Sequence, residues 1–140
     1  MNISEDVISR QFDVDDFDEF LDDLVVEIEL RNYRVTRIYD IDNVLEQEER
    51  GLSETVTFTR YKIVEFCNLN SCAQMMSADP SAGVFMPVKF IAYQKKTDAS
   101  VHAAFLRPTR FAALFTSAGV MEIADGLEKD MQDVLDELDY

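Results

Sequence analysis

One stretch of this chain decides the fold: Tyr61-Lys62-Ile63-Val64-Glu65-Phe66-Cys67-Asn68. Its residues alternate in the manner of a β-strand, and the run stops at Cys67 and Asn68, directly before a segment with helical character. A thiol at the point where a strand gives way to a helix lies near unpaired backbone N–H groups, which favour the thiolate form. Cys67 is therefore the first candidate for chemistry in this chain.

The composition is that of one ordinary domain. The chain has 140 residues with 47% hydrophobic content, enough to bury a core without metal or disulfide staples. The N-terminus lacks a secretory signal pattern, and no apolar run approaches the roughly 18 residues of a membrane span. We therefore expect a single cytoplasmic domain over residues 1–140 without membrane association, and both cysteines as free thiols.

The formal net charge of −15 is concentrated in two segments, 13–29 and 122–139. Both segments also carry apolar residues at helical spacing, so we expect the acids to coat the solvent faces of two helices. Such faces repel polyanions, which disfavours nucleic-acid binding. Docking of a basic partner, or an adaptation to salt, stays open as a second interpretation of these faces.

The first half of the chain predicts a strand, a long helix and a further strand. Val7 to Phe12 forms the first strand, and Asp13 or Asp15 then caps a helix that ends near Arg31-Asn32. Tyr33 to Ile41 alternates as a strand. Its alternation places these side chains on one side: Tyr33, Val35, Arg37, Tyr39 and Ile41.

Further elements follow in the same order along the chain. The charged segment Asp42 to Arg50 predicts a short exposed helix or a mobile loop, and Glu54 to Phe66 predicts a long strand. A helix over Asn70 to Ala78, capped by Asn70 or Ser71, stops at Asp79-Pro80. The rest of the chain predicts a strand over Val84 to Gln94 interrupted by Pro87, a hairpin partner over Ala99 to Leu106, a helical turn at Pro108, and a terminal helix over Val120 to Leu138.

This order predicts an α+β domain with an antiparallel sheet and helices packed on one face, in a β-α-β-β-α-β-β-α type order. The other sheet face must then be solvated or buried by a partner. Phe85, Phe90 and Tyr93 place apolar side chains on both sides of one strand, and a homodimer is the leading explanation. A pocket between the sheet and the helices would use the same residues.

Four motifs in this order resemble the domain of unknown function 302 family. They are Asn32 to Val35 after the first helix, Tyr61 to Asn68, Ala78 to Pro87 after the second helix, and the strand Val88 to Tyr93. The resemblance implies a compact α+β fold similar to the TATA-binding-protein-like arrangement, usually dimeric and with no established activity. The fold name carries no implication of DNA binding. Cys72, the acidic segment Asp42 to Arg50 and the acidic helices depart from the family pattern.

The candidate ligand site lies at the strand-to-helix junction, where Cys67 and Asn68 approach Phe85 and Pro87. Asn68 offers an amide to orient a carbonyl or an oxyanion beside the thiol. The alternative for Cys67 is a small buried residue that packs where the strand meets the helix. Cys72 provides a possible redox partner, because it could close a disulfide with an oxidised Cys67.

The sequence offers few other chemical sites. The spacing of Cys67 and Cys72 matches no standard zinc or redox motif, and recruiting the single histidine, His102, still leaves too few soft ligands for a metal. We therefore expect no metal, no cofactor and no catalytic residues; phosphate-binding glycine loops and nucleophile elbows are absent from the sequence.

Three functions remain in competition. The first is a homodimeric binding module that holds a small apolar or anionic ligand near Cys67, Asn68, Phe85 and Pro87. The second is a redox or sensory thiol at Cys67, and the third is an interaction protein whose acidic helices dock a basic partner. The binding module is the preferred hypothesis.

Overall fold

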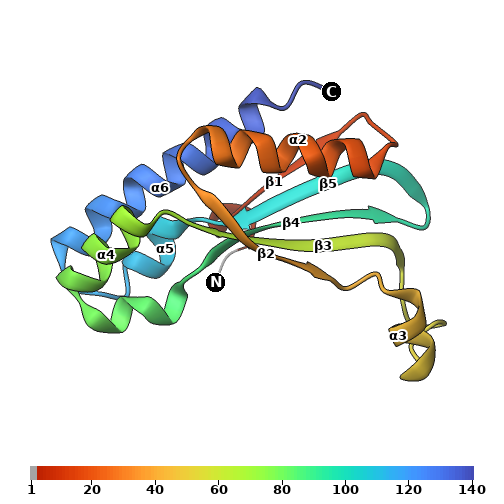
Figure 1. Ribbon diagram of the computed structural model, residues 1–140, viewed down its shortest axis with the longest axis horizontal. Coiled ribbons are helices and arrows are strands. Elements are labelled where there is room, and N and C mark those ends of the chain that lie inside the picture. Colours follow the sequence, from red (N-terminus) through yellow and green to blue (C-terminus); the bar gives the residue numbers. More distant parts are fainter. Residues whose placement is uncertain (1–2) are drawn as a thin grey trace.

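The computed structural model describes residues 3–140 of the chain (Figure 1). The strands are β1 (Val7–Phe12), β2 (Arg34–Asp40), β3 (Phe58–Cys67), β4 (Val88–Lys95) and β5 (Asp98–Leu106). The helices are α1 (Ile3–Asp6), α2 (Phe17–Leu30), α3 (Val44–Glu49), α4 (Leu69–Ala78), the 3₁₀ helix η1 (Pro80–Phe85), α5 (Pro108–Ala112) and α6 (Ala118–Glu137). No helix in this described part of the chain is long and apolar enough to cross a membrane.

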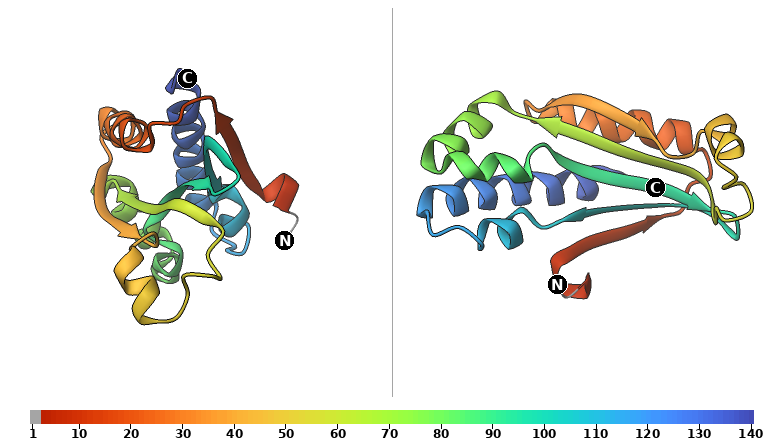
Figure 2. Two further views of the ribbon diagram at one scale, coloured as in Figure 1. Left: turned by 90° about the vertical axis from the view of Figure 1, so that its right-hand side faces the viewer. Right: turned by 90° about the horizontal axis from the view of Figure 1, so that it is seen from below.

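The five strands form one antiparallel sheet in the order β1-β5-β4-β3-β2. Helices α2 and α6 lie side by side on one face of this sheet, and α4, η1 and α5 gather at one end (Figure 1). Seen from below, the strands lie in front of α2 and α6 (Figure 2). We call this uncovered side the open face. The predicted α+β class, with helices on one side of an antiparallel sheet, is confirmed.

The strand register determines which side chains reach each face. Val64 pairs with Phe90 and both are fully buried, whereas the next pair, Ile63 and Ile91, points to the other side and is only half-buried. The core side of the sheet packs against apolar residues of the helices. Buried helix residues are Phe17, Phe20, Leu24 and Ile28 of α2, and Val120, Ala124, Leu127, Met131, Val134 and Leu135 of α6.

The α3 segment projects from the body on the side of the open face (Figure 1). We call residues 42–54, which contain α3 and the turn after it, the arm. The sequence predicts either a short exposed helix or a mobile loop here, and the structure has the helix. Asn43 caps it, because its Oδ1 accepts a hydrogen bond from the Glu46 N–H at 3.1 Å.

The predicted face of β2 is wrong beyond Val35. Val35 pairs with Phe66 and Arg37 with Glu65, so the register shifts at Thr36 and one extra residue enters the strand. Such a bulge reverses the alternation, because side chains point to opposite faces with a period of two. Arg37 and Tyr39 therefore lie on the open face, opposite to the side of Val35.

Two predicted helix caps are also corrected. Asp16, rather than Asp13 or Asp15, caps α2 by accepting a hydrogen bond from the Glu19 N–H at 3.0 Å. Asn68, rather than Asn70 or Ser71, caps α4. In both places several residues can cap a helix, and only the direction of the preceding chain selects one of them.

Two predicted strands are shorter than expected. Residues 54–57 form a turn and a connection rather than the start of β3, and residues 80–85 form η1 rather than the start of β4. Pro87 follows a cis Met86–Pro87 bond and precedes β4, so it removes no hydrogen bond from the ladder.

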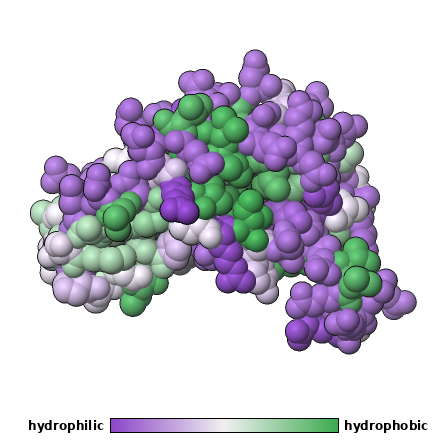
Figure 3. Space-filling model, viewed as in Figure 1, coloured by the Kyte–Doolittle hydropathy of each residue, from purple (hydrophilic) through white to green (hydrophobic). Residues whose placement is uncertain are grey.

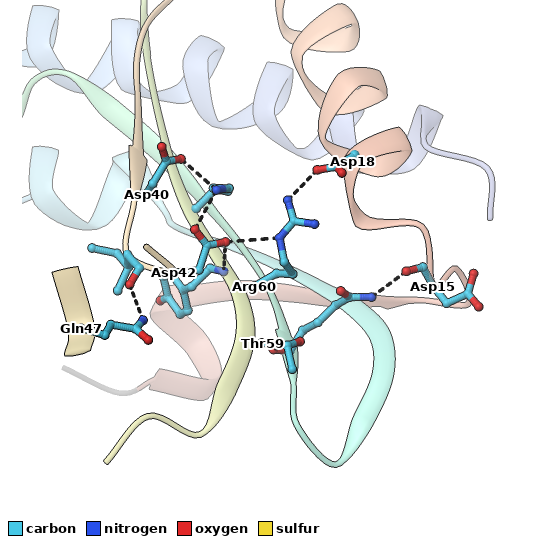
Figure 4. Close-up of polar contacts among 11 residues, drawn as sticks. Asp15, Asp18, Asp40, Asp42, Gln47, Thr59 and Arg60 are labelled. Carbon is cyan, nitrogen blue, oxygen red and sulfur yellow. Dashed lines mark hydrogen bonds and ion pairs between the residues drawn. The ribbon is translucent and has the colours of Figure 1, made fainter. Parts of the chain in front are cut away.

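The base of the arm is held by Asp42, whose side chain is only 6% exposed. Its carboxylate accepts hydrogen bonds from the Tyr61 N–H at 2.9 Å and from Lys62 Nζ at 2.7 Å, and contacts Arg60 Nε at 3.4 Å (Figure 4). Burial alone would lower the pKa of Lys62, but hydrogen bonds and charges from Asp42 and Asp40 outweigh it and raise that pKa above its ordinary value.

The same cluster ties the arm to α2. Arg60 bonds Asp18 of α2 at 2.5 Å, and its guanidinium stacks over the Phe17 ring at 4.7 Å from the centroid. The Arg60 hydrogen bond and charge lower the pKa of Asp18. Near the same site, Gln47 Nε2 donates to the Ile41 carbonyl at 2.8 Å (Figure 4). The arm is therefore attached by buried polar contacts at its base.

We predict that Asp42→Asn lowers the free energy of unfolding by about 2–4 kcal/mol, because it leaves Lys62 and Arg60 without their buried carboxylate. Urea denaturation followed by circular dichroism measures this loss. Asp125→Asn on the exposed surface of α6 is the control and is expected within about 0.5 kcal/mol of wild type. Equal stability of the two variants would contradict the role given to Asp42.

Candidate functional site

A row of aromatic rings crosses one end of the open face. Tyr61 of β3 stacks on Tyr93 of β4 with ring centroids 5.4 Å apart, and Tyr93 stacks on His102 of β5 at 5.1 Å. Phe58 packs against Tyr61 at 5.0 Å. The register explains this row, since Tyr61 pairs directly with Tyr93 and Tyr93 with His102.

A cavity of about 630 Å³ opens beside this row. Phe58, Tyr61 and Tyr93 form its aromatic side. Lys95 and Lys96, both exposed, line it at the turn between β4 and β5, and Glu54 lines it from the end of the arm. The cavity thus combines flat apolar surface with two positive charges and one negative charge.

The hydroxyl of Tyr61 stays protonated over an extended pH range. Burial, with a smaller contribution from neighbouring Tyr93, raises the pKa of Tyr61 above its ordinary value. At neutral pH the ring therefore offers a neutral hydroxyl that can both donate and accept hydrogen bonds.

The far end of the aromatic row is fixed by Asp98. Hydrogen bonds from the Ser100 hydroxyl and backbone N–H, together with one from His102, lower the pKa of Asp98 to about 2. His102 Nε2 lies 3.1 Å from this carboxylate, and Gln11 donates to the Ser100 hydroxyl at 2.8 Å. The His102 ring is thereby held against Tyr93 by a charged partner, which keeps the row ordered.

The structure joins the sulfur atoms of Cys67 and Cys72 in a disulfide at the β3–α4 junction. This corrects the expectation of free thiols, because neither cysteine is free. The reason is geometric. Cys67 ends β3 and Cys72 lies in the first turns of α4, and the short connection through Asn68 folds the helix back until the two sulfurs meet.

Asn68 uses both ends of its amide for structure. Its Oδ1 accepts from the Ser71 N–H at 3.1 Å, and its Nδ2 donates to the Asn32 carbonyl at 2.8 Å. Asn32 follows α2 and has a left-handed φ of 66°, a conformation that asparagine tolerates better than most residues. Asn68 thus links the end of α2 to the start of α4.

Phe85 and Pro87 line a different and smaller cavity of about 220 Å³, together with Lys89, Leu106 and Phe111. Phe85 also stacks on Phe111 with ring centroids 4.8 Å apart. Phe66 pairs with Val88, so the strand ends that carry Cys67 and Pro87 do meet. Lys89 and Lys95 stand six residues apart on β4, which separates the two cavities by about 20 Å.

No group of three or more His, Cys, Asp or Glu side chains within residues 3–140 is arranged to hold a metal ion. The cavity beside Tyr93 accordingly presents aromatic carbon, hydroxyl and ammonium groups, rather than a set of metal ligands.

Residues 9–138 match the model of the family described as domain of unknown function DUF302. The chain belongs to the DUF302 family. It is also similar to a solved structure titled "Crystal structure of uncharacterized conserved protein DUF302 from Bacillus stearothermophilus", with 21% identity, a TM-score of 0.79, and coverage of 93% of this chain and 95% of that one. That likeness concerns the fold. No curated protein matches the chain.

The resemblance to DUF302 in the sequence is therefore confirmed, whereas the most distinctive cavity of this DUF302 chain was not predicted. Tyr61 and Tyr93 lie on two strands whose relative register cannot be deduced from composition. The sequence Lys95-Lys96 predicts only a polar turn. One signal was present in the sequence: Tyr61 and Ile63, like Ile91 and Tyr93, repeat large side chains on one face of each strand.

Proposed function

We propose that this protein is a homodimeric binding module that holds a small planar anion on the open face of its sheet. One observation carries the proposal: an open cavity of about 630 Å³ has an aromatic side and two lysines in a chain whose net charge is −15. The hydrogen bonds of Asn68 are structural, so we place the ligand in the cavity beside Tyr93 instead of at the junction of Cys67 and Asn68.

The size and the lining of the cavity support a small planar ligand. Sites for small molecules typically occupy about 300–1,000 Å³ and are lined by apolar and aromatic groups with a few polar ones. Phe58, Tyr61 and Tyr93 supply ring surface against which a flat ligand can pack. Offset or edge-on contacts between aromatic rings contribute about 0.5–1.5 kcal/mol beyond area burial.

The local charges support a ligand with a single negative charge. Lys95 and Lys96 lie at the cavity, whereas the acids of α2 and α6 lie on the covered side of the sheet. At physiological ionic strength, screening over about 8 Å leaves the two nearby lysines dominant. Glu54 also lines the cavity and disfavours a polyanion, so an aromatic monocarboxylate fits better than a polyphosphate.

The homodimer is supported by the side chains of the open face. Ile63, Ile91 and Tyr93 are half-buried within one protomer, yet no helix of the described chain lies over them (Figure 2). An apolar sheet face of this kind is typically buried in a core or by a partner.

We predict that naphthoate, a planar aromatic monocarboxylate, binds the purified protein and that naphthamide, its neutral counterpart, binds about fivefold more weakly. Isothermal titration calorimetry compares the two. The double variant Lys95→Gln/Lys96→Gln should weaken naphthoate binding about tenfold, because each exposed charge contact contributes up to about 1 kcal/mol. Tyr93→Leu should cause a similar loss by removing the stacked ring.

Lys129→Gln is the matched control, since Lys129 is a 79% exposed lysine on α6. It should bind naphthoate as wild type does. If Lys129→Gln and the double variant weaken binding equally, the interaction is with the protein's general charge rather than with this cavity. Absence of naphthoate binding to the wild type would remove the proposed ligand class.

A second candidate function is a reversible thiol switch, which the meeting of the Cys67 and Cys72 sulfurs supports. In this cycle a peroxide oxidises the two thiols: hydrogen peroxide accepts two electrons, the S–S bond forms, and two water molecules leave. The switch keeps the cytoplasmic location expected from the sequence, because cytosolic disulfides are usually transient and redox-sensing or catalytic.

We predict that peroxide treatment of the reduced protein makes both cysteines resistant to alkylation and that dithiothreitol restores both. Mass spectrometry after alkylation measures this. Cys72→Ser should leave Cys67 unable to form the intramolecular bond, so that Cys67 instead becomes trapped as a sulfenic acid or a mixed disulfide. Cysteines that stay alkylable after peroxide would exclude the switch.

A further inference from the structure

The arm carries three apolar side chains that are largely exposed to solvent. Val44 is 61% exposed, Leu45 is 72% exposed and Leu52 is 41% exposed. At the lower right of Figure 3, the projecting α3 segment shows hydrophobic surface among hydrophilic residues. A single exposed apolar side chain is common, but three on one projecting segment form a small apolar surface that faces solvent in the single protomer.

Contacts within a single protomer already order the arm. Asp42 fixes its base through contacts to the Tyr61 N–H and to Lys62, and Gln47 donates to the carbonyl of Ile41, directly before the arm. Leu52 N–H donates to the Gln47 carbonyl at 2.8 Å and closes the turn after α3. A segment ordered in this way loses little conformational entropy on docking.

The charges of the arm select the surface that it can contact. Four glutamates, Glu46, Glu48, Glu49 and Glu54, stand against one arginine, Arg50, so the arm is acidic. The solvent sides of α2 and α6 are acidic as well and would repel it. An acidic, apolar arm requires a basic, apolar surface.

The open face has that character. On this face, its strands and the adjoining turn carry five cations, Arg34, Arg37, Lys89, Lys95 and Lys96, against two carboxylates, Glu65 and Asp98. Ile63, Ile91 and Leu106 supply apolar area between them. Within residues 3–140 the arm and the open face are therefore complementary in both charge and hydropathy.

We infer that a second copy of this chain occupies the open face, with the arm of each protomer lying over the partner's sheet. Because the arm projects on the same side as the open face (Figure 1), one two-fold axis can bring both arms onto both faces at once. The inference rests on the homodimer of the proposed function and specifies the surface and the segment that form it.

The area of the open face is smaller than a stable dimer interface requires, so the arms must contribute to it. Five strands spaced about 4.8 Å apart, with about seven residues of each in the ladder, present roughly 550 Å² of flat face. A stable interface buries about 800 Å² per partner. The face alone falls short, and an arm from each protomer supplies the difference while closing the partner's cavity from solvent.

The test is the dimer dissociation constant of the full chain, measured by analytical ultracentrifugation over a concentration series. Leu45→Asp should weaken the dimer at least about tenfold, because it places a charge where a leucine is buried. Leu114→Asp is the matched control: Leu114 is 75% exposed and lies outside the arm, so its variant should dimerise as wild type does.

Lys89→Glu on the receiving face provides a second, independent variant and should weaken the dimer about fivefold or more. Circular dichroism confirms that each variant is folded. A wild type that stays monomeric at the highest concentration, or a Leu45→Asp variant that dimerises as tightly as Leu114→Asp, would overturn the inference.

Naphthoate titration of Leu45→Asp separates this inference from the ligand proposal. If the arm forms the dimer, the variant dimerises at least about tenfold more weakly than wild type whether or not naphthoate binds to it. A wild-type dimer that depends on Leu45 but binds no naphthoate removes only the ligand. A wild-type dimer that binds naphthoate but does not depend on Leu45 removes only the arm contact, and a wild type that never dimerises removes both the homodimer and the arm contact.

Discussion

The packing of α2 and α6 against Phe66, Phe90 and Phe105 is the contact on which the rest of the structure depends. Phe66 stacks on Phe90 with centroids 5.4 Å apart, and Phe90 meets Phe105 edge-on at 5.4 Å. These side chains are almost completely buried. The alternation of each strand then sends the intervening residues to the opposite face, so one-sided packing leaves a second, half-buried apolar surface.

One-sided packing also separates the charges. The helices that cover the sheet carry 13 of the 28 acidic residues, whereas Lys89, Lys95 and Lys96 belong to the side without helices or to its adjoining turn. A chain with a net charge of −15 thereby keeps one surface on which an anion or an acidic arm can approach. Both of our proposals, for the aromatic cavity and for the arm, use this same surface, and Glu54 of the arm lines the cavity beside Phe58.

Periodicity in the sequence predicted the α+β fold because burial of Val64 and Phe66, or of Leu24 and Ile28, leaves a direct pattern in the chain. The bulge at Thr36 and the choice of Asp16 as a cap leave no such pattern, since they depend on how neighbouring segments pack. The cavity could not be predicted for the same reason: Tyr61, Tyr93 and Lys96 meet only through strand register. The role of Asp42 depends on the burial of its side chain, and the sequence of an acidic segment does not show which of its acids is buried.

We infer that a second copy of the chain covers the open face in the assembled protein and that this face is the binding surface. Hydroxyl-radical footprinting of the tyrosines at low and at high protein concentration tests it most directly. We expect the oxidation of Tyr61 and Tyr93 to fall as the protein concentration rises. The oxidation of Tyr140, which is 36% exposed near the end of α6, should stay unchanged. Equal oxidation of Tyr61 and Tyr93 at both concentrations would contradict a second copy covering the open face.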